Sequence, residues 1–346
     1  MTVRVVFAWI ACLSIGALAG WACSRIGTPI PWMLGPMFAV GCLRVSGVRL
    51  VTPPGGREIG QLIIGTALGL YFTPVVVREV VGWWLLLAVG AVFAIALGYI
   101  GGLFLARLAG LDRTTAIFAS VPGGAMEMAV LGHRYGGRAD AIAAAQSLRI
   151  ALVVAVIPAV FYKIGVHGTD AYLPGITAFD PKGFALLMAA TAAGGMLFQR
   201  LRLPNAFVFG ALALAIPLTA AEINLSAVPT GVSNAGQWLL GCSLGSRFHP
   251  DFRKGAPRFV AAVVTSVLIT FAVTAAFGIA LAWVSGLNPA TLVLGLAPGG
   301  VAEMCITAKG LQLGVPLVTA FQVVRLVALL SLTAPVFAWL RRRRRE

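Results

Sequence analysis

Residues 120–130 read SVPGGAMEMAV and residues 296–306 read LAPGGVAEMCI, and both stretches lie inside long apolar sequence. Proline has no backbone N–H and two successive glycines weaken a helix, so each Pro-Gly-Gly predicts a break in a helix at membrane depth. A glutamate follows the second glycine of each break by three residues. The fold of the chain depends on what these two stretches do.

The composition indicates an integral membrane protein. Of the 346 residues, 59% are hydrophobic and 11% are charged, whereas soluble domains carry about 25% charged residues. Runs such as residues 80–106 are long enough to cross a hydrocarbon core of about 30 Å, which takes about 20 apolar residues. We therefore predict an all-α, multi-pass membrane protein whose direct surroundings are the lipid bilayer.

The formal net charge of +15 is explained better by membrane topology than by binding to nucleic acid. Lys and Arg accumulate in the cytoplasmic loops of membrane proteins, and five arginines at 341–345 directly follow the last apolar segment. We interpret residues 341–346 as a cytoplasmic tail that holds the topology and contacts anionic lipid. No nucleic-acid partner is predicted.

Neither the cysteines nor the histidines are spaced as metal ligands. The five cysteines are scattered through apolar segments, and the three histidines, His133, His167 and His249, lie far apart in the sequence. Zinc sites and disulfide frameworks use closely spaced pairs of such residues. We therefore predict no metal and no cofactor.

The chain contains an internal duplication, which is its most specific signal. Residues 60–72, GQLIIGTALGLYF, match residues 236–248, GQWLLGCSLGSRF, at an offset of 236 − 60 = 176. The same offset relates the two Pro-Gly-Gly stretches to each other. We assign residues 1–165 to a first membrane repeat, 166–181 to a connecting loop, 182–340 to a second membrane repeat and 341–346 to the tail.

Each repeat contains six apolar segments. The first follows a short basic start, and we interpret it as a retained helix rather than a cleaved signal peptide. The expected segments are residues 5–24, 30–48, 58–73, 80–106, 114–132 and 139–162, then 182–199, 204–221, 233–248, 257–285, 291–308 and 314–340.

The distribution of Lys and Arg favours ten crossings over twelve. Twelve crossings place 13 basic loop residues inside and 11 outside, which contradicts the positive-inside tendency. If both Pro-Gly-Gly segments enter and leave on one side, the count becomes 19 inside and 5 outside. We therefore predict ten transmembrane helices plus two broken or re-entrant segments, with both termini cytoplasmic. Five crossings per repeat invert the second repeat, as in many secondary transporters with a site near the midplane.

The two breaks are predicted to supply backbone groups to a binding site. Unwound backbone survives at membrane depth only where it lines a cavity or binds something. A helix that begins at the break presents free N–H groups to an anion, and the freed carbonyls suit a cation. The residues concerned are Pro122, Gly123, Gly124, Pro298, Gly299 and Gly300.

Glu127 and Glu303, in the segments after the breaks, are candidate ion-coupling groups. A carboxylate inside a membrane segment costs several kcal/mol unless it is paired, hydrated or protonated. Burial raises the pKa of a carboxyl group, which suits exchange of protons near neutral pH. The alternative is that each glutamate caps its new helix or pairs with an arginine. The two roles are compatible in one transport cycle.

Gln146 with Arg149, and Gln322 with Arg325, form a second pair of repeated features. Spacing of three places each Gln and Arg on one helix face. The arginines either neutralise the two glutamates or bind a carboxylate or phosphate through two hydrogen bonds. Two further glutamines in glycine-rich segments line the same cavity or only mark close helix packing; they are Gln61 and Gln237.

The doubled PGGxxEM motif, the GQxxxGxxLG segment at 60–69 and PWMLGP at 31–36 resemble the bacterial membrane AbrB-like family, whose members contain two copies of a membrane "AbrB duplication" domain. Members carry labels such as transporter, regulator of gene expression and ammonia monooxygenase. The resemblance implies a location in the bacterial cytoplasmic (inner) membrane. A monooxygenase needs clustered metal ligands, which three isolated histidines do not supply.

We therefore predict a secondary transporter of a small anionic organic solute, coupled to protons or sodium, and not an enzyme. The site would lie at the interface of the two inverted repeats. The alternative is a membrane-embedded regulator of gene expression that acts through a partner or through the solute it moves. A homodimer is left open by the sequence.

Overall fold

The computed structural model describes residues 3–168, 172–248 and 257–342. Parts of three predictions lie outside these residues. They are the Arg-rich tail from residue 343 on, the stretch 169–171 of the connecting loop, and the group of His249, Arg253 and Lys254.

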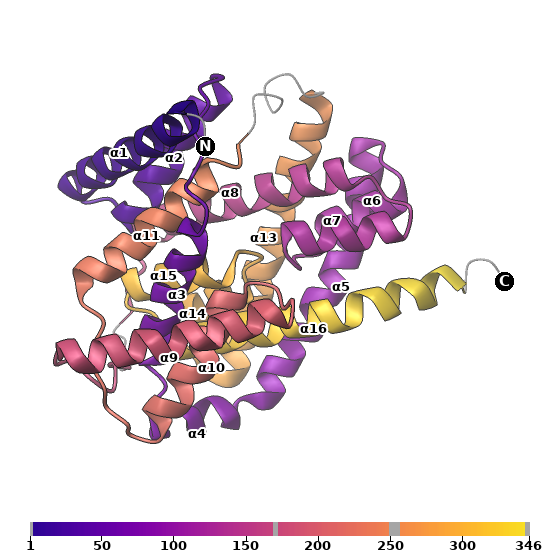
Figure 1. Ribbon diagram of the computed structural model, residues 1–346. Coiled ribbons are helices and arrows are strands. Elements are labelled where there is room, and N and C mark those ends of the chain that lie inside the picture. Colours follow the sequence, from indigo (N-terminus) through magenta and orange to yellow (C-terminus); the bar gives the residue numbers. More distant parts are fainter. Residues whose placement is uncertain (1–2, 169–171, 249–256, 343–346) are drawn as a thin grey trace. The chain divides into compact units, whose positions relative to one another are not determined.

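All regular structure in the described residues is α-helical (Figure 1). The predicted all-α class is confirmed. The helices are α1 (Val3–Ile26), α2 (Pro31–Val45), α3 (Gly56–Gly69), α4 (Pro74–Gly82), α5 (Trp84–Ala109), α6 (Arg113–Ser120), α7 (Ala125–Arg134), α8 (Ala139–Lys163), α9 (Pro181–Arg200), α10 (Ala206–Ala220), α11 (Thr230–Gly245), α13 (Pro257–Ser285), α14 (Pro289–Leu296), α15 (Val301–Gly310) and α16 (Val315–Arg342).

Six helices in the described part of the chain are long and apolar enough to cross a membrane: α1, α5, α8, α9, α13 and α16. The pair α3 and α4, bent by 91°, makes a seventh if it counts as one span. The helices α2, α3, α10 and α11 have 14 to 16 residues, or about 21–24 Å at 1.5 Å per residue. The multi-pass class is supported, and the count of ten crossings stays a prediction.

The chain divides into two compact units, and each unit combines segments from both sequence repeats. The first unit contains Met1–Glu79, Ile157–Lys254 and Cys305–Pro316, and the second contains Val80–Val156, Gly255–Met304 and Leu317–Glu346. The predicted boundaries follow the duplication, whereas the units follow contacts. Both Pro-Gly-Gly breaks belong to the second unit.

In the first unit, helices pack closely through small residues. Helix α9 lies against α10, α2 against α1 and α11, and α3 against α10 and α11. Where α9 meets α10, Gly194 and Gly210 face each other, and a Cβ on either glycine would collide with the backbone of the other. Small residues allow such approaches in a membrane, where apolar area alone does not drive helices together.

In the second unit, equivalent contacts recur at the offset of 176 residues. Helices α5 and α13 pack against each other, α6 packs on α5, and α14 packs on α13. A Cβ at Gly102 of α5 would lie 2.6 Å from the Cα of Ile117, and one at Gly278 of α13 would lie 3.1 Å from the Cα of Val293. Both pairs are separated by the offset, since 278 − 102 = 176 and 293 − 117 = 176.

The half-helices α6 and α14, each of eight residues, begin at equivalent caps. The side chain of Asp112 accepts a hydrogen bond from the Thr115 N–H at 2.8 Å. Asn288, 176 residues further on, accepts from the N–H groups of Ala290 and Thr291 at 2.9 and 3.3 Å. Asp and Asn are preferred at this position because their oxygens satisfy N–H groups that the helix itself cannot.

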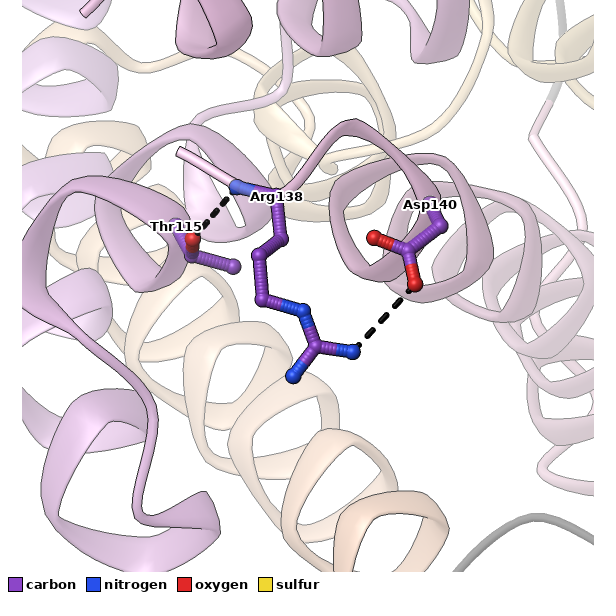
Figure 2. Close-up of polar contacts among 3 residues, drawn as sticks. All are labelled: Thr115, Arg138 and Asp140. Atoms are coloured by element: carbon purple, nitrogen blue, oxygen red, sulfur yellow. Dashed lines mark hydrogen bonds and ion pairs between the residues drawn. The ribbon is translucent and has the colours of Figure 1, made fainter. Parts of the chain in front are cut away.

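Helices α6 and α7 form a hairpin around the first break. The backbone N–H of Arg138, which follows α7, donates to Thr115 Oγ1 in the first turn of α6 at 2.8 Å (Figure 2). The rings of Phe118 and Tyr135 stack with their centroids 5.9 Å apart. The chain therefore returns, after the break, to the level at which α6 began. An exposed ion pair joins Arg138 to Asp140 at 3.2 Å.

Candidate binding site at the two breaks

Both Pro-Gly-Gly stretches interrupt helices, as the sequence predicts. Helix α6 ends at Ser120 and α7 begins at Ala125, while α14 ends at Leu296 and α15 begins at Val301. In each break the N–H of the first glycine donates to the carbonyl two residues earlier, at 2.9 Å in the first and 2.8 Å in the second. This is the pattern of a γ-turn centred on the proline. The turn reverses the chain and leaves the last carbonyls of each half-helix without helical partners.

The first glycine of each break makes room for a methionine. A Cβ at Gly123 would lie 2.5 Å from the Cε of Met128, and one at Gly299 would lie 2.7 Å from the Cε of Met304. Both methionines are fully buried. The spacing of glycine and methionine in PGGxxEM is therefore a packing requirement in both copies.

The second glycine of each break makes room for the glutamate. A Cβ at Gly124 would collide with Glu127 Oε2, and one at Gly300 would collide with Glu303 Oε2. Each carboxylate lies in the first turn of the helix after the break, where the helix dipole favours negative charge. Gly124 also has a φ of +97°, which disfavours any other residue. Both glutamates are half-buried.

The last helix of each repeat carries one buried glutamine, Gln146 in α8 and Gln322 in α16. Each donates hydrogen bonds to carbonyl groups at the end of the half-helix before it. Gln146 Nε2 donates to the carbonyl oxygens of Phe118 and Val121 at 2.8 and 2.7 Å. Gln146 and Gln322 are both fully buried. The acceptors of Gln322 Nε2 are the carbonyl oxygens of Leu294, Gly295 and Ala297, at 3.1, 3.0 and 3.1 Å.

Arg325 also donates hydrogen bonds to carbonyl groups at the end of α14 and in the second break. Its Nη2 donates to the carbonyl of Gly299 at 2.8 Å and to Gln322 Oε1 at 2.7 Å. Its Nη1 donates to the carbonyls of Leu296, at 3.5 Å, and Ala297. A cation at a helix C-terminus is stabilised by the dipole and by the orphan carbonyls. The guanidinium is 3% exposed, so these hydrogen bonds replace the water it lacks.

Arg149 occupies the equivalent position in the first repeat but bonds differently. It is 5% exposed, and its Nη1 reaches the carbonyl of Ser120 at 3.4 Å, longer than the 2.7–3.2 Å that is usual for N–H···O bonds. Its buried Nε has no hydrogen-bond partner among the described residues. The terminal nitrogens of Arg149 are therefore less well satisfied than those of Arg325.

A pocket in the second unit is lined by Arg149, by the end of α6 that precedes the first break, and by one residue of the second break. Ala119 and Ser120 come from the end of α6, and Pro298 comes from the second Pro-Gly-Gly. Helix α13 adds the hydroxyl residues Ser266 and Thr270. The pocket is small and opens partly outward. The half-helix before the first break and the proline of the second break thus contribute to one partly polar cavity.

The other predicted site residues lie at the two breaks or in the first unit. Backbone carbonyls next to the breaks accept hydrogen bonds from Gln146, Gln322 and Arg325. The second glycine of each break is in contact with the glutamate that follows it, Glu127 or Glu303. Gln61 and Gln237 belong to the first unit, where Gln61 Nε2 donates to Asn205 Oδ1 at 3.1 Å. No group of three His, Cys, Asp or Glu in the described ranges is placed to hold a metal ion.

Sequence reasoning missed the hydroxyl groups of the pocket. Ser266 and Thr270 are four residues apart, and so share one face of the long apolar segment 257–285, while Ser120 directly precedes the first VPGG. That spacing is a signal, but an isolated hydroxyl in a membrane helix also bonds its own backbone. Only their place in the lining of one pocket with Arg149 gives the three hydroxyl residues a shared role.

The six long apolar helices and the paired broken half-helices define a multi-pass, all-helical membrane protein. A family model described as "Transition state regulatory protein AbrB" matches residues 32–341. Because this match spans most of the chain, the protein belongs to that family, and the resemblance seen in its motifs is confirmed.

Two relatives match nearly the whole chain. A protein of Bacillus subtilis (strain 168) named "Uncharacterized protein YhjN" is 24% identical, over 94% of this chain and 91% of its own. A protein of Escherichia coli (strain K12) named "Putative regulator AbrB" is 26% identical, over 94% of this chain and 92% of its own.

Proposed function

We propose that the chain is a secondary transporter of a small anionic organic solute, coupled to protons or sodium, and not an enzyme. The observation that carries the proposal is the pocket in which a buried arginine lies with the end of α6, next to the first break, and with Pro298 of the second break. Unwound backbone and a buried cation are expensive at membrane depth. A ligand that enters and leaves the pocket gives both a function, as in transporters with discontinuous helices.

Coupling is assigned to Glu127 and Glu303. Each lies at the start of a helix that begins at a break and is half-buried there. The carboxylate form is favoured by the helix N-terminus, and binding of a proton or sodium ion would weaken that interaction. Occupancy of the glutamate would thereby influence the packing of the carboxyl group on its glycine and the conformation of the break.

The predicted topology belongs to the same proposal. The hairpin of α6 and α7 supports a re-entrant first segment, because its ends meet through Arg138 and Thr115 and each arm is too short to span about 30 Å. With a re-entrant second segment as well, ten crossings result. The repeats are then inverted, both termini lie in the cytoplasm, and the protein lies in the inner membrane.

The test is gradient-driven uptake by purified protein in liposomes. A panel of radiolabelled small carboxylates is offered with an imposed pH or sodium gradient, and accumulation should collapse when the gradient is dissipated. Glu127→Gln and Glu303→Gln should lose accumulation, whereas Glu222→Gln, which changes an exposed carboxylate, should retain it. Folded protein that accumulates no carboxylate under either gradient would contradict the proposal.

A regulator of gene expression is the second candidate, because the matching family description contains the word "regulatory" and one relative's name contains the word "regulator". Such a protein needs a cytoplasmic contact surface, and the basic tail at 341–346 is the candidate. Deletion of these six residues should then abolish changes in transcript levels while leaving membrane insertion and solute uptake intact. Transcript changes that follow uptake instead would assign regulation to the transported solute.

A further inference from the structure

Arg149 and Arg325 are equivalent in the duplication but not in their hydrogen bonding. The two terminal nitrogens of Arg325 donate to three backbone carbonyls and to Gln322. Arg149 makes one hydrogen bond, at 3.4 Å, to the carbonyl of Ser120. A duplicated residue that keeps its burial and loses its partners has acquired a different task.

Arg149 lines the pocket and keeps donor groups beyond the one that it directs at α6. Nη1 is directed at the backbone of α6, and Nε has no partner among the described residues. A carboxylate binds an arginine through two parallel N–H···O bonds, and the Nε and Nη2 edge presents two donors at the required spacing. A guanidinium in the lining of a pocket therefore suits a carboxylate better than a single acceptor atom.

Hydroxyl groups surround the same pocket. Ser120 and Thr270 lie on either side of Gly101, since a Cβ at Gly101 would be 2.8 Å from Ser120 Oγ and 3.6 Å from Thr270 Oγ1. Ser266, also in the lining, is 5% exposed. Hydroxyls donate to whichever oxygen faces them, so they add hydrogen bonds without adding charge.

The charge and the apolar part of the lining restrict the ligand further. Arg149 is the one charged residue among those that line the pocket. A single cation in surroundings of low dielectric balances a single negative charge, and a dianion would leave one charge unpaired and buried. The rest of the lining is apolar: Leu105, Ala119, Ala145, Val263, Val267 and Pro298. An apolar lining favours an anion with a short hydrocarbon part over a bare inorganic ion.

We infer that this pocket binds the carboxylate of a small monocarboxylic acid through Arg149, with hydroxyls of Ser266 and Thr270 as further donors. Arg325 is a positioning residue that fixes the second break and does not touch the ligand. This inference deepens the proposed function, on which it rests, by naming the substrate class and by giving the two equivalent arginines different roles.

Binding is measured by calorimetry on the full-length protein in detergent, with acetate and propionate as probes. Propionamide is the neutral control, and chloride and inorganic phosphate are the inorganic controls. Propionate should bind more tightly than acetate, because it buries one more methylene, and the three controls should bind at least about tenfold more weakly. Failure of both carboxylates to bind, or equal binding of propionamide, chloride or phosphate, would overturn the inference.

Two arginine variants separate the roles. Arg149→Lys should weaken propionate binding about tenfold, because lysine keeps the charge but not the paired donors. Arg325→Lys should lower the melting temperature and leave the dissociation constant within about twofold. Wild-type affinity in Arg149→Lys, or an equal loss of affinity in a folded Arg325→Lys, would contradict the assignment.

Ser266→Ala provides a variant that is not expected to disturb folding, and it should weaken propionate binding about threefold without changing the melting temperature. Unchanged binding in Ser266→Ala together with Thr270→Val would exclude the hydroxyls. Because these experiments measure binding, a failure of the inferred pocket can be distinguished from a failure of the proposed transport. Protein that binds propionate at Arg149 but moves no solute would refute the transporter alone, and uptake without this binding would refute the pocket alone.

Discussion

Arg325 Nη2 donates to Gln322 Oε1 at 2.7 Å, and the two side chains together hold the carbonyl groups at the end of α14 and in the second break. The amide of Gln322 orients the guanidinium, and the guanidinium supplies the positive charge that the helix end favours. In the first repeat Gln146 keeps its bonds to the backbone, but Arg149 keeps only one, to Ser120. The second break is thus held more firmly than the first.

Replacement of Gln146 or Gln322 should destabilise the protein in proportion to the number of carbonyl groups to which the glutamine donates hydrogen bonds. Gln322→Leu leaves three buried carbonyl acceptors without this donor and removes the partner of Arg325, at about 1–3 kcal/mol per unsatisfied group. Gln146→Leu affects two acceptors and should lower the melting temperature less. Gln199→Leu, at an exposed position, is the matched control. Thermal unfolding in detergent measures the order, and a larger effect at Gln146 than at Gln322 would contradict it.

The contact between the second glycine and the glutamate can be tested by a double-mutant cycle. Gly300→Ala should be strongly destabilising, and Glu303→Ala in the same chain should recover most of the loss because it removes the colliding carboxylate. Gly124→Ala should be recovered less completely by Glu127→Ala, since φ at Gly124 is +97° and alanine there retains about 1 kcal/mol or more of strain.

Gly231→Ala is the control for this cycle, because a Cβ at that glycine meets nothing within 4 Å. The coupling energy of each pair is obtained from the unfolding free energies of the single and double variants. Additive effects at Gly300 and Glu303 would show that the carboxylate does not press on the glycine.

Asn205 in the first unit should tolerate aspartate better than alanine. Its Oδ1 accepts from Arg57 Nη2 at 3.2 Å and Gln61 Nε2 at 3.1 Å, and its φ is +47°. Aspartate keeps the acceptor, adds attraction to Arg57 and tolerates the left-handed backbone. Glycine keeps only the backbone conformation, and alanine keeps neither. Melting temperatures should fall in the order Asp, Gly, Ala, and a more stable Ala variant than Gly variant would contradict the role of φ.

The hairpin of α6 and α7 should depend on Thr115 more than on the ion pair beside it. Thr115 is fully buried, and Thr115→Val removes the acceptor of the Arg138 N–H, at about 1–3 kcal/mol. Arg138 and Asp140 have side chains that are 65% and 74% exposed, so Asp140→Asn should change stability by less than about 1 kcal/mol. Hydrogen exchange of the Arg138 amide reports the local opening, and equal protection in wild type and Thr115→Val would disprove the contact.

The sequence revealed the breaks and the repeat because both are local or periodic properties. A proline followed by two glycines removes an N–H and weakens the helix at three successive positions, so the ends of α6 and α14 were predictable from two Pro-Gly-Gly stretches. Single prolines such as Pro158 and Pro335 lie inside α8 and α16. The long apolar runs predicted α5, α8 and α13 for the same reason: their length and hydropathy are properties of one segment. The offset of 176 residues predicted that Gln146 and Gln322 would have equivalent places.

The partners of these residues were not predictable, because they depend on which segments fold against one another. The sequence left each glutamate and arginine with open alternatives, and it gave no reason to join Ser266 and Thr270 to Arg149. The structure packs α13 against α5 and thereby brings those hydroxyls to the pocket. It also places the glutamines and arginines on backbone carbonyls, which carry no sequence signal because every residue has one.

By itself, then, the sequence determined an all-helical membrane protein, a duplication and two broken helices, since these follow from hydropathy, proline chemistry and a fixed register. Only the tertiary structure decided that equivalent arginines have unequal partners: Arg325 is held by the carbonyls of its own break, and Arg149 lines a pocket and donates one long hydrogen bond to the carbonyl of Ser120. The physical reason is that a hydrogen bond depends on distance and direction between segments far apart in the chain, and identical residues at identical spacing do not fix either.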